Sequence, residues 1–193
     1  IIQLGTTGVF VIYDELEGKE AVTWSYLLHT VELPMEIQEL TDEVKVIGKN
    51  KAGGVSVAHL FSSAKTEQAM VDTFFCAPTN WKNVTNAQGK AVKYPNHWHF
   101  TATSEKAQVY RFATVINTHA LKYPAKDPEI LSDGRIKVGG WLISVNLKSD
   151  GAPSFFIRST QEKVNITYKG EATVINEDGY ETVMRDTVPE LEI

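Results

Sequence analysis

The chain has 193 residues, of which 42% are hydrophobic and 22% are charged, and it carries a formal net charge of −5. This size and composition predict an ordinary globular protein with one sizeable core or two small ones. Because acidic and basic residues are interspersed, the overall field excludes nucleic acid and anionic membrane surfaces as partners attracted by bulk charge, and an acidic polysaccharide would need a local basic site.

The single cysteine and the opening residues bear on the cellular setting. Cys76 has no possible intrachain disulfide partner, and its neighbours Phe75 and Ala77 predict a small buried hydrophobe. No apolar run approaches the ~20 residues of a membrane-spanning helix, so no membrane insertion is predicted. The opening residues IIQLGTTG lack the features of a signal peptide and enter a strand pattern at once. We therefore expect the chain to be a piece of a longer protein.

The first predicted elements flank a polar break near the N-terminus. Val9 to Tyr13 is rich in β-branched and aromatic residues, Glu17 to Glu20 is polar, and Ala21 to Leu28 is a second apolar run. Two strand-type runs around a polar break predict a β-hairpin.

Further strand signals recur along the chain with turn residues between them. Pairs that suit positive φ in hairpin turns are Gly53-Gly54, Asp133-Gly134, Asp150-Gly151 and Asp178-Gly179. The predicted strands cover residues 1–4, 9–14, 22–31, 44–47, 55–61, 97–103, 109–117, 141–147, 155–158, 164–168, 172–174 and 181–184. Many short strands at near-regular spacing predict an all-β fold, an antiparallel β-sandwich of layered sheets with little or no helix.

One segment, Ser62 to Phe75, fits two periods. Ala64, Val71 and Phe75 share a face if the segment is a short helix behind a serine cap. With period two, Ala69, Val71 and Phe75 face one side instead, and the setting among strands favours this second interpretation.

The domain organisation depends on a polar, proline-bearing connection, residues 122–134. A subdomain seam there is the alternative to a single unit. Because the last 55 residues or so are close to the marginal size for independent folding, the sequence favours one β-sandwich unit over residues 1–193.

The motif NHWHF offers the best local case for a metal site. His97 and His99 lie on one face if the segment is a strand, with Trp98 and Phe100 on the other. Zinc needs further ligands, and the candidates His59, His119 and Asp72 show no recognisable spacing. The favoured interpretation is that Trp98 and Phe100 enter the core while the histidines face solvent or a polar interface, so neither a metal nor another cofactor is predicted.

No catalytic residue is predicted. His29, at the end of a strand, could act as a general base, but a structural histidine is the favoured interpretation. Asp14 and Glu15 are adjacent on one strand, so their carboxylates diverge and cannot act as a paired acid and base. The chain contains no nucleophile elbow, phosphate-binding loop or dinucleotide fingerprint.

An aromatic and basic segment before NHWHF is the candidate carbohydrate-contact site. A flat aromatic face can stack on a sugar ring, and a lysine can meet a carboxylate or sulfate. The alternative is that these aromatic side chains anchor a long loop onto the sandwich. The candidate contacts are Trp81, Tyr94, Trp98 and Lys93.

The segment GVFVIYDELEGKEAVTWSYLLHT, residues 8–30, resembles the closing sandwich strands of heparinase II/III-like polysaccharide lyases. Weaker resemblance covers YRFATVIN and the pair GGWLISVNL and FFIRS. Members of this family combine an N-terminal toroid of paired helices with a β-sandwich region and cleave uronate-containing polysaccharides by β-elimination. The family's catalytic and metal-binding motifs have no matching position in this chain.

The resemblance implies a noncatalytic C-terminal β portion of such a lyase, which supports or shapes the substrate cleft. The implied partners are the helical toroid of the same protein and, through the parent enzyme, an acidic polysaccharide. The implied location is the periplasm or the extracellular space. Two alternatives stay open: a stand-alone carbohydrate-binding or adhesion module, and a small enzyme that uses His97 and His99.

Overall fold

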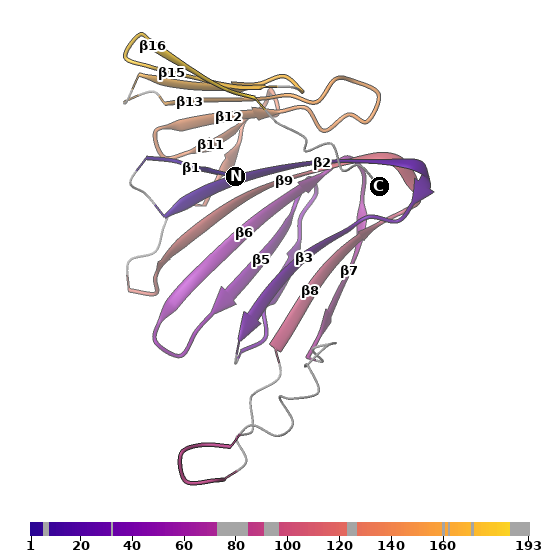
Figure 1. Cartoon of the computed structure of the whole chain (residues 1–193), viewed down its shortest axis with the longest axis vertical. Coiled ribbons are helices and arrows are strands. Elements are labelled where there is room, and N and C mark those ends of the chain that lie inside the picture. The colour runs from indigo at the N-terminus through magenta and orange to yellow at the C-terminus, as the bar shows by residue number, and fades with distance from the viewer. Residues whose placement is uncertain are drawn as a thin grey trace.

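The computed structural model describes residues 1–5, 8–31, 33–72, 85–90, 97–122, 127–159, 161, 163–170 and 172–185. These residues contain no helix, and their strands form three antiparallel sheets that pack as layers (Figure 1). The predicted all-β, layered antiparallel fold is therefore confirmed. Within the same residues, no helix is available that is long and apolar enough to cross a membrane.

The three sheets differ in how their strands connect. The central sheet has the order β1 (Ile2–Gln3), β2 (Val9–Val22), β9 (Ala107–Ala120), β6 (Gly54–Ser62), β5 (Val44–Lys49) and β4 (Glu36–Glu39). A smaller sheet has the order β3 (Ser25–Val31), β8 (His97–Ser104) and β7 (Thr66–Val71). The third sheet is a meander of β10 (Glu129–Ile130), β11 (Ile136–Val138), β12 (Trp141–Val145), β13 (Phe155–Ser159), β14 (Val164–Tyr168), β15 (Ala172–Glu177) and β16 (Tyr180–Arg185).

The central and smaller sheets are joined by three strand-to-strand bends that lie side by side. The chain passes from β2 to β3, from β8 to β9 and from β6 to β7, so that consecutive strands enter different sheets. The Ser104 amide donates to the Trp24 carbonyl at 2.9 Å, and the Trp24 indole donates to the Ala107 carbonyl at 2.9 Å. These bonds tie the first bend to the second.

The hairpin predicted between residues 9 and 28 is wrong. β2 pairs with β9, and β3 pairs with β8. The polar residues 17–20 do not turn the chain; they continue β2, with a register shift between Glu17 and Val22, and the chain bends only at Thr23 and Trp24. Alternation cannot distinguish a hairpin from a bend that sends the second strand into another layer.

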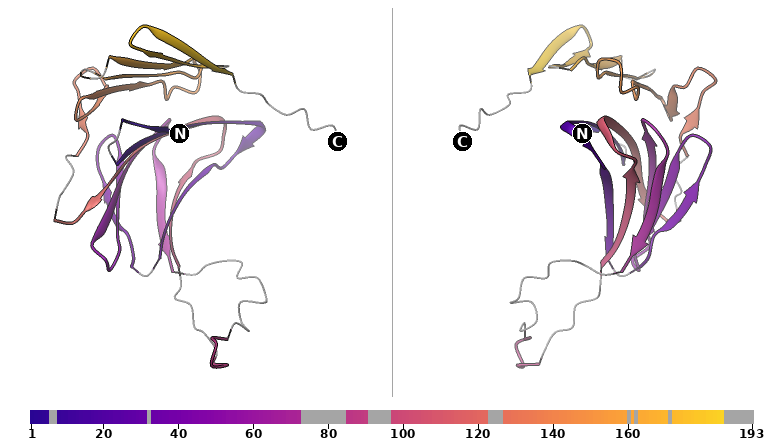
Figure 2. Two further views of the ribbon diagram at one scale, coloured as in Figure 1. Left: turned by 60° about the vertical axis from the view of Figure 1, so that its left-hand side comes forward. Right: turned by 90° about the vertical axis from the view of Figure 1, so that its right-hand side faces the viewer.

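Two hydrophobic clusters lie on opposite faces of the central sheet. In β9, the odd-numbered residues Ala113 and Val115 pack against the seven-stranded sheet, whereas Tyr110 and Phe112 pack against the smaller sheet. Residues 110–115 are therefore buried without interruption. Figure 2 shows the seven-stranded sheet above the other two sheets.

Several predicted turns have the expected backbone. Gly53, Gly134 and Gly179 have φ of +85°, +80° and +87°, and Asp178 has φ of +49°. The register Glu177 to Tyr180 makes Asp178 and Gly179 the two-residue loop of the β15–β16 hairpin, where positive φ is required at both positions. Gly151 does not have a positive φ, so this part of the prediction is wrong.

The structure bears on the two segments whose interpretation the sequence left open, residues 62–75 and residues 122–134. Residues 66–71 form β7, as the period-two interpretation of residues 62–75 predicts, and Ala69 and Val71 are exposed on one face. The seven-stranded sheet begins inside the predicted seam, at Glu129. One hydrophobic cluster joins its residues to Val9 and Val11 of β2, so the two sides of the seam share a core.

Candidate functional site

A histidine cluster lies on the outer face of the three-stranded sheet. Phe100 and Trp98 point inward and pack in the cluster beneath the central sheet, so His97 and His99 lie on the opposite face. The predicted orientation of the H-x-H pair is therefore confirmed. The register of β3 and β8 places His29 directly across from His99.

The rings of His29 and His99 are in contact. Their centroids are 4.1 Å apart, and the ring planes are inclined at 45°. Partial burial and the nearby imidazoles of His99 and His97 lower the pKa of His29 below its usual value. The lowered pKa favours the neutral ring, which is the form that can accept a proton or bind a metal. We name His29, His97 and His99 the outer histidines.

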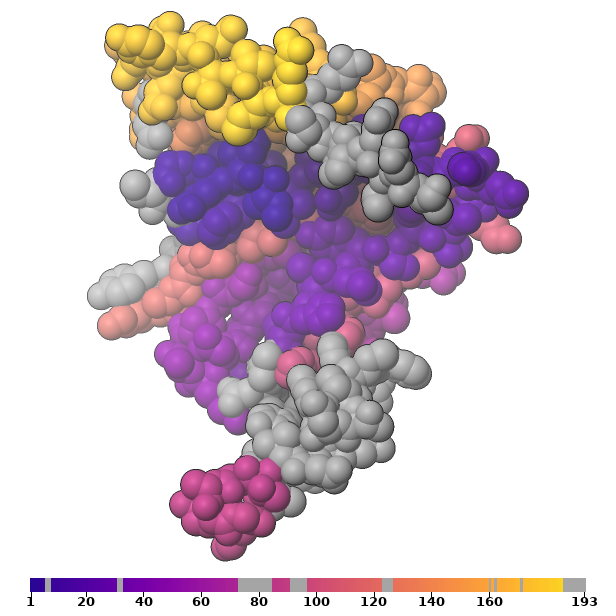
Figure 3. Space-filling view, viewed as in Figure 1, coloured from indigo at the N-terminus to yellow at the C-terminus, as the bar shows by residue number. Residues whose placement is uncertain are grey.

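An aromatic cleft lies between β2 and the seven-stranded sheet. The rings of Phe155 and Tyr168 stack with centroids 5.4 Å apart, and Tyr13 meets Phe155 edge-on at 5.8 Å. The Tyr13 hydroxyl donates to the Asn146 carbonyl at 2.8 Å, which fixes that ring. The cleft encloses about 450 Å³, and in Figure 3 the seam between its indigo and yellow walls faces the viewer.

Two carboxylates belong to the walls of this aromatic cleft. Asp14 pairs with Phe112 and Glu15 with Arg111, so the two side chains lie on opposite faces of β2 and diverge as predicted. Burial raises the pKa of Asp14. Glu15 lies 3.4 Å from the guanidinium of Arg111, which is 2% exposed.

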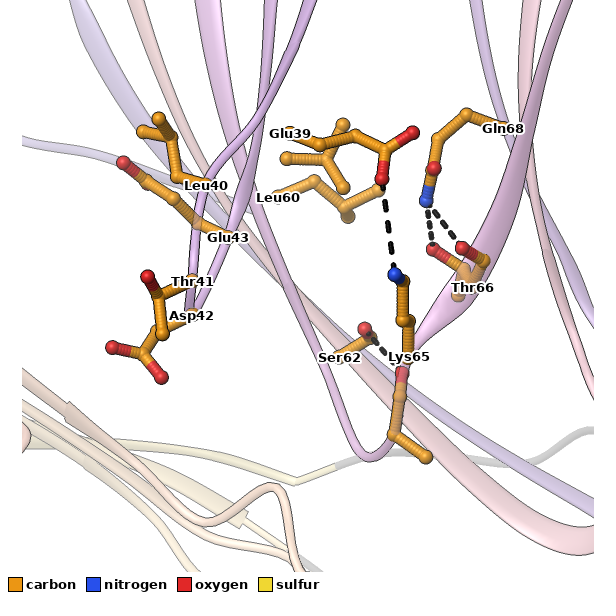
Figure 4. A pocket seen from close by; sticks show the side chains of 12 residues that line it. Glu39, Leu40, Thr41, Asp42, Glu43, Leu60, Ser62, Lys65, Thr66 and Gln68 are labelled. Carbon is orange, nitrogen blue, oxygen red and sulfur yellow. Dashed lines mark hydrogen bonds and ion pairs between the residues drawn. The ribbon is translucent and has the colours of Figure 1, made fainter.

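A second hollow lies between the start of β5 and β7, and it is polar. It encloses about 410 Å³, and Figure 4 shows Glu39 and Lys65 pointing toward each other across it. Their charged atoms are 4.0 Å apart. Gln68 donates to the carbonyl and the hydroxyl of Thr66, and Glu43 lies on the opposite wall. This arrangement of hydroxyl, amide and carboxylate groups is able to hydrogen-bond to a polar ligand.

Beside the polar hollow lies a network of ionisable side chains that runs from the buried His59 and Glu43 to the exposed Asp127. Nδ1 of His59 is 2.9 Å from Oε2 of Glu43, and its Nε2 is 3.8 Å from Oδ1 of Asp127. Lys45 contacts the other oxygen of Asp127 at 2.6 Å. Because the His59 side chain is only 2% exposed, this network ties the segment before β10 to β5 and β6 and offers no accessible base.

Of the predicted carbohydrate contacts, Trp98 lies among the residues that the structure describes. Trp98 is partly buried on the inner face of β8 and packs in the cluster beneath the central sheet. Trp81, Lys93 and Tyr94 lie outside the described residues, as does Cys76. The proposed sugar-contact role of these side chains stays a prediction.

Neither the aromatic cleft nor the position of His29 beside His99 can be predicted from local sequence patterns. Tyr13, Phe155 and Tyr168 come from distant strands, and only the pairing of β13 with β14 and the packing of both sheets bring them together. The contact of His29 with His99 depends on the pairing of β3 with β8, which is not visible in local spacing. Of the third ligands considered for the H-x-H pair, His59 lies in the buried network instead.

The comparisons with known proteins add no relationship. No family model matches this chain, and none of the curated proteins compared with it matches either.

Proposed function

We propose that this chain is the noncatalytic C-terminal β portion of a heparinase II/III-like polysaccharide lyase. In this role it supports or shapes a cleft in which the parent enzyme degrades uronate-containing polysaccharides by β-elimination. Its partners are the helical toroid of the same protein and, through the parent enzyme, the acidic polysaccharide. The proposed location is the periplasm or the extracellular space, as the resemblance implies.

The proposal rests on the resemblance of residues 8–30 to the closing sandwich strands of this family. It forms β2, the bend and β3, which link the central sheet to the smaller one. Side chains of this segment, including Val11, Leu16 and Leu28, pack in the two hydrophobic clusters. A segment that joins two layers in this way supports a structural role for the residues that resemble the family.

The requirements of the elimination support the proposed noncatalytic role. The reaction needs a base at the uronate C5 proton and a group that neutralises the uronate carboxylate. In the described part of the polar hollow, Lys65 faces Glu39, and the nearest histidine, His59, is buried. A base and a cation therefore do not meet at an accessible surface in this hollow.

Reading the parent gene tests the proposal. We expect the coding sequence upstream of residue 1 to encode a long helical region with the pattern of paired helices. A short upstream region, or one that encodes an unrelated domain, would refute the lyase assignment and leave a stand-alone module.

A stand-alone carbohydrate-binding module is the second candidate, and the aromatic cleft favours it. Phe155 and Tyr168 are half-buried and lie at a cleft large enough to take a sugar ring. Glu15 lies on the same face of β2 as Tyr13 and places an acidic group at this cleft, so the cleft favours neutral glycans over uronate-rich ones.

Calorimetry with neutral and uronate-containing oligosaccharides tests this candidate. Tyr168→Ala should weaken binding by about tenfold or more, as expected when a stacked aromatic ring is lost. Tyr180→Ala is the matched control, because Tyr180 is 82% exposed and does not contribute to the cleft. Equal binding by both variants, with folding verified by circular dichroism, would remove the cleft from consideration.

A further inference from the structure

We propose that the outer histidines His29, His97 and His99 form a Zn²⁺ site with three imidazole ligands and one open coordination position. The site lies on the outer face of the smaller sheet, where β3 ends and β8 begins. It is independent of the proposed lyase role, which assigns no metal to this chain.

The pairing of β3 with β8 places the three histidines on one face of the smaller sheet. His29 and His99 are directly opposed across β3 and β8. Opposed side chains in an antiparallel pair have Cβ atoms about 4.5–5.5 Å apart. His97 lies two residues before His99 on the same strand, so it projects from the same face as its diagonal neighbour. The backbone therefore places all three histidines on one face of the smaller sheet, with His97 diagonal to His29.

The rings of His29 and His99 lie close to the separation that a shared zinc ion requires. A tetrahedral Zn²⁺ with Zn–N bonds of about 2.0–2.1 Å holds two imidazole centroids about 5 Å apart. The centroids of His29 and His99 are already 4.1 Å apart, so a small outward turn of the two rings admits the ion. The described residues hold no preformed set of three metal-binding side chains. His97 must turn toward the other two rings when the metal binds.

The neighbours on the same face decide which metal suits the site. The residues opposite and beside His99 on this face are Val71 and Thr101, and Leu27 pairs with Thr101. None of these three side chains carries a carboxylate. A set of imidazole ligands suits zinc and other late first-row metals, whereas Mg²⁺ and Ca²⁺ require oxygen ligands. Since His29 is exposed, the fourth position is open to water or to an oxygen of a ligand.

Zinc titration of the untagged, metal-stripped chain by isothermal calorimetry tests the site. We expect one Zn²⁺ per chain. The variants His29→Ala, His97→Ala and His99→Ala should each weaken the affinity by at least about 10–100-fold, the range seen when even an outer-shell partner of a ligand is removed. His119→Ala, which removes a histidine from β9, should leave the affinity unchanged.

Cobalt substitution provides a readout that does not depend on stability. Co²⁺ bound to the chain should give the intense visible absorption of a tetrahedral site, and the absorption should be lost in the His29 and His99 variants whose circular dichroism matches the unmodified chain. His29→Gln gives a second variant with a side chain of similar size. Failure to take up Zn²⁺, or uptake that is unchanged in any of the three outer-histidine variants, would overturn the proposal.

Discussion

At the scale of single residues, Arg111 is the most constrained charged group in the described structure. It lies on β9 between the central and seven-stranded sheets and is 2% exposed. Its guanidinium donates to the carbonyls of Lys148 and Gly151 and lies 3.4 Å from Glu15. One side chain therefore fixes the loop after β12 against the central sheet.

Removing Arg111 should strongly destabilise the fold. Arg111→Ala leaves the carbonyls of Lys148 and Gly151 and the partly buried carboxylate of Glu15 without this donor, and it leaves a cavity in the interior, so we expect the free energy of unfolding to fall by about 3 kcal/mol. Urea denaturation measures this loss. Arg135→Ala is the matched control, because Arg135 is exposed on the surface and pairs with the neighbouring Asp133, so its loss should leave stability almost unchanged. Equal losses in both variants would contradict the structural role of Arg111.

Asp14 should make stability depend on pH in a specific direction. Burial raises its pKa in the folded state above the ordinary aspartate value of 3.8. Between these two values the folded state binds more protons than the unfolded state, so this group's contribution to stability rises as pH falls through the folded pKa. At pH 7 the ionised carboxylate opposes folding.

The variant Asp14→Asn tests this sign. It should have a higher Tm than the unmodified chain at neutral pH, and the difference between the two proteins should shrink as pH falls toward 3.8, the ordinary pKa of aspartate. Thermal unfolding of both proteins across this range measures it. A difference that stays constant with pH would show that Asp14 is not desolvated.

At the scale of elements, hydrogen bonds at Ser104 join two of the bends that connect the central sheet to the smaller sheet. Ser104 is 4% exposed; its hydroxyl oxygen accepts from the Trp24 amide at 2.9 Å, and the hydroxyl donates to the Glu105 carbonyl at 2.6 Å. Ser104→Ala should lower the free energy of unfolding by about 1–3 kcal/mol, because a buried amide loses its acceptor.

Ser25→Ala is the control for this bend. The Ser25 hydroxyl lies on the exposed face of the same sheet, 3.3 Å from Thr103, and its loss should change stability by less than about 0.5 kcal/mol. Chemical denaturation of both variants compares them. If the Ser104 variant is as stable as the Ser25 variant, the bond between the bends is not needed for the fold.

Local sequence patterns predict the strands better than their partners. The long strands β2, β6, β8 and β9 each contain a predicted run, because β-branched and aromatic residues mark them directly. β4, β10 and β11 were not predicted; they are short and carry polar or charged residues at a sheet edge or beside it. The pairing of β2 with β9 joins residues about a hundred positions apart, and alternation carries no information about such distances.

At the scale of the whole molecule, β9 is the centre of the layered arrangement. It pairs with β2 on one side and β6 on the other, and both of its faces are buried. β16, in contrast, is last in the described order of its sheet, and all of its residues are exposed.

Hydrogen exchange should reproduce this contrast. Amides of residues 109–117 should exchange only through global unfolding, whereas those of β16 should exchange through local opening. Mass spectrometry of exchanged peptides at increasing urea concentration measures both. Similar protection in the two strands would contradict the central position of β9.

For the candidate sites, too, local spacing predicts which face a side chain occupies but not which distant residue lies beside it. The H-x-H spacing was sufficient to predict that His97 and His99 share a face. It could not indicate that His29, almost seventy residues earlier, completes the group, because this depends on the register of β3 with β8. The aromatic cleft depends in the same way on the packing of two sheets, to which Tyr13 and Tyr168 belong.

The most direct test of the proposed function is an assay of the chain against heparan sulfate, heparin, chondroitin and alginate. Absorbance of unsaturated uronate follows elimination, and calorimetry follows binding in the same samples. The account predicts no growth of absorbance with any of the four polysaccharides, because the described residues present no accessible base beside a cation in the polar hollow. Growth of absorbance that depends on the chain would contradict the noncatalytic role and direct attention to the outer histidines.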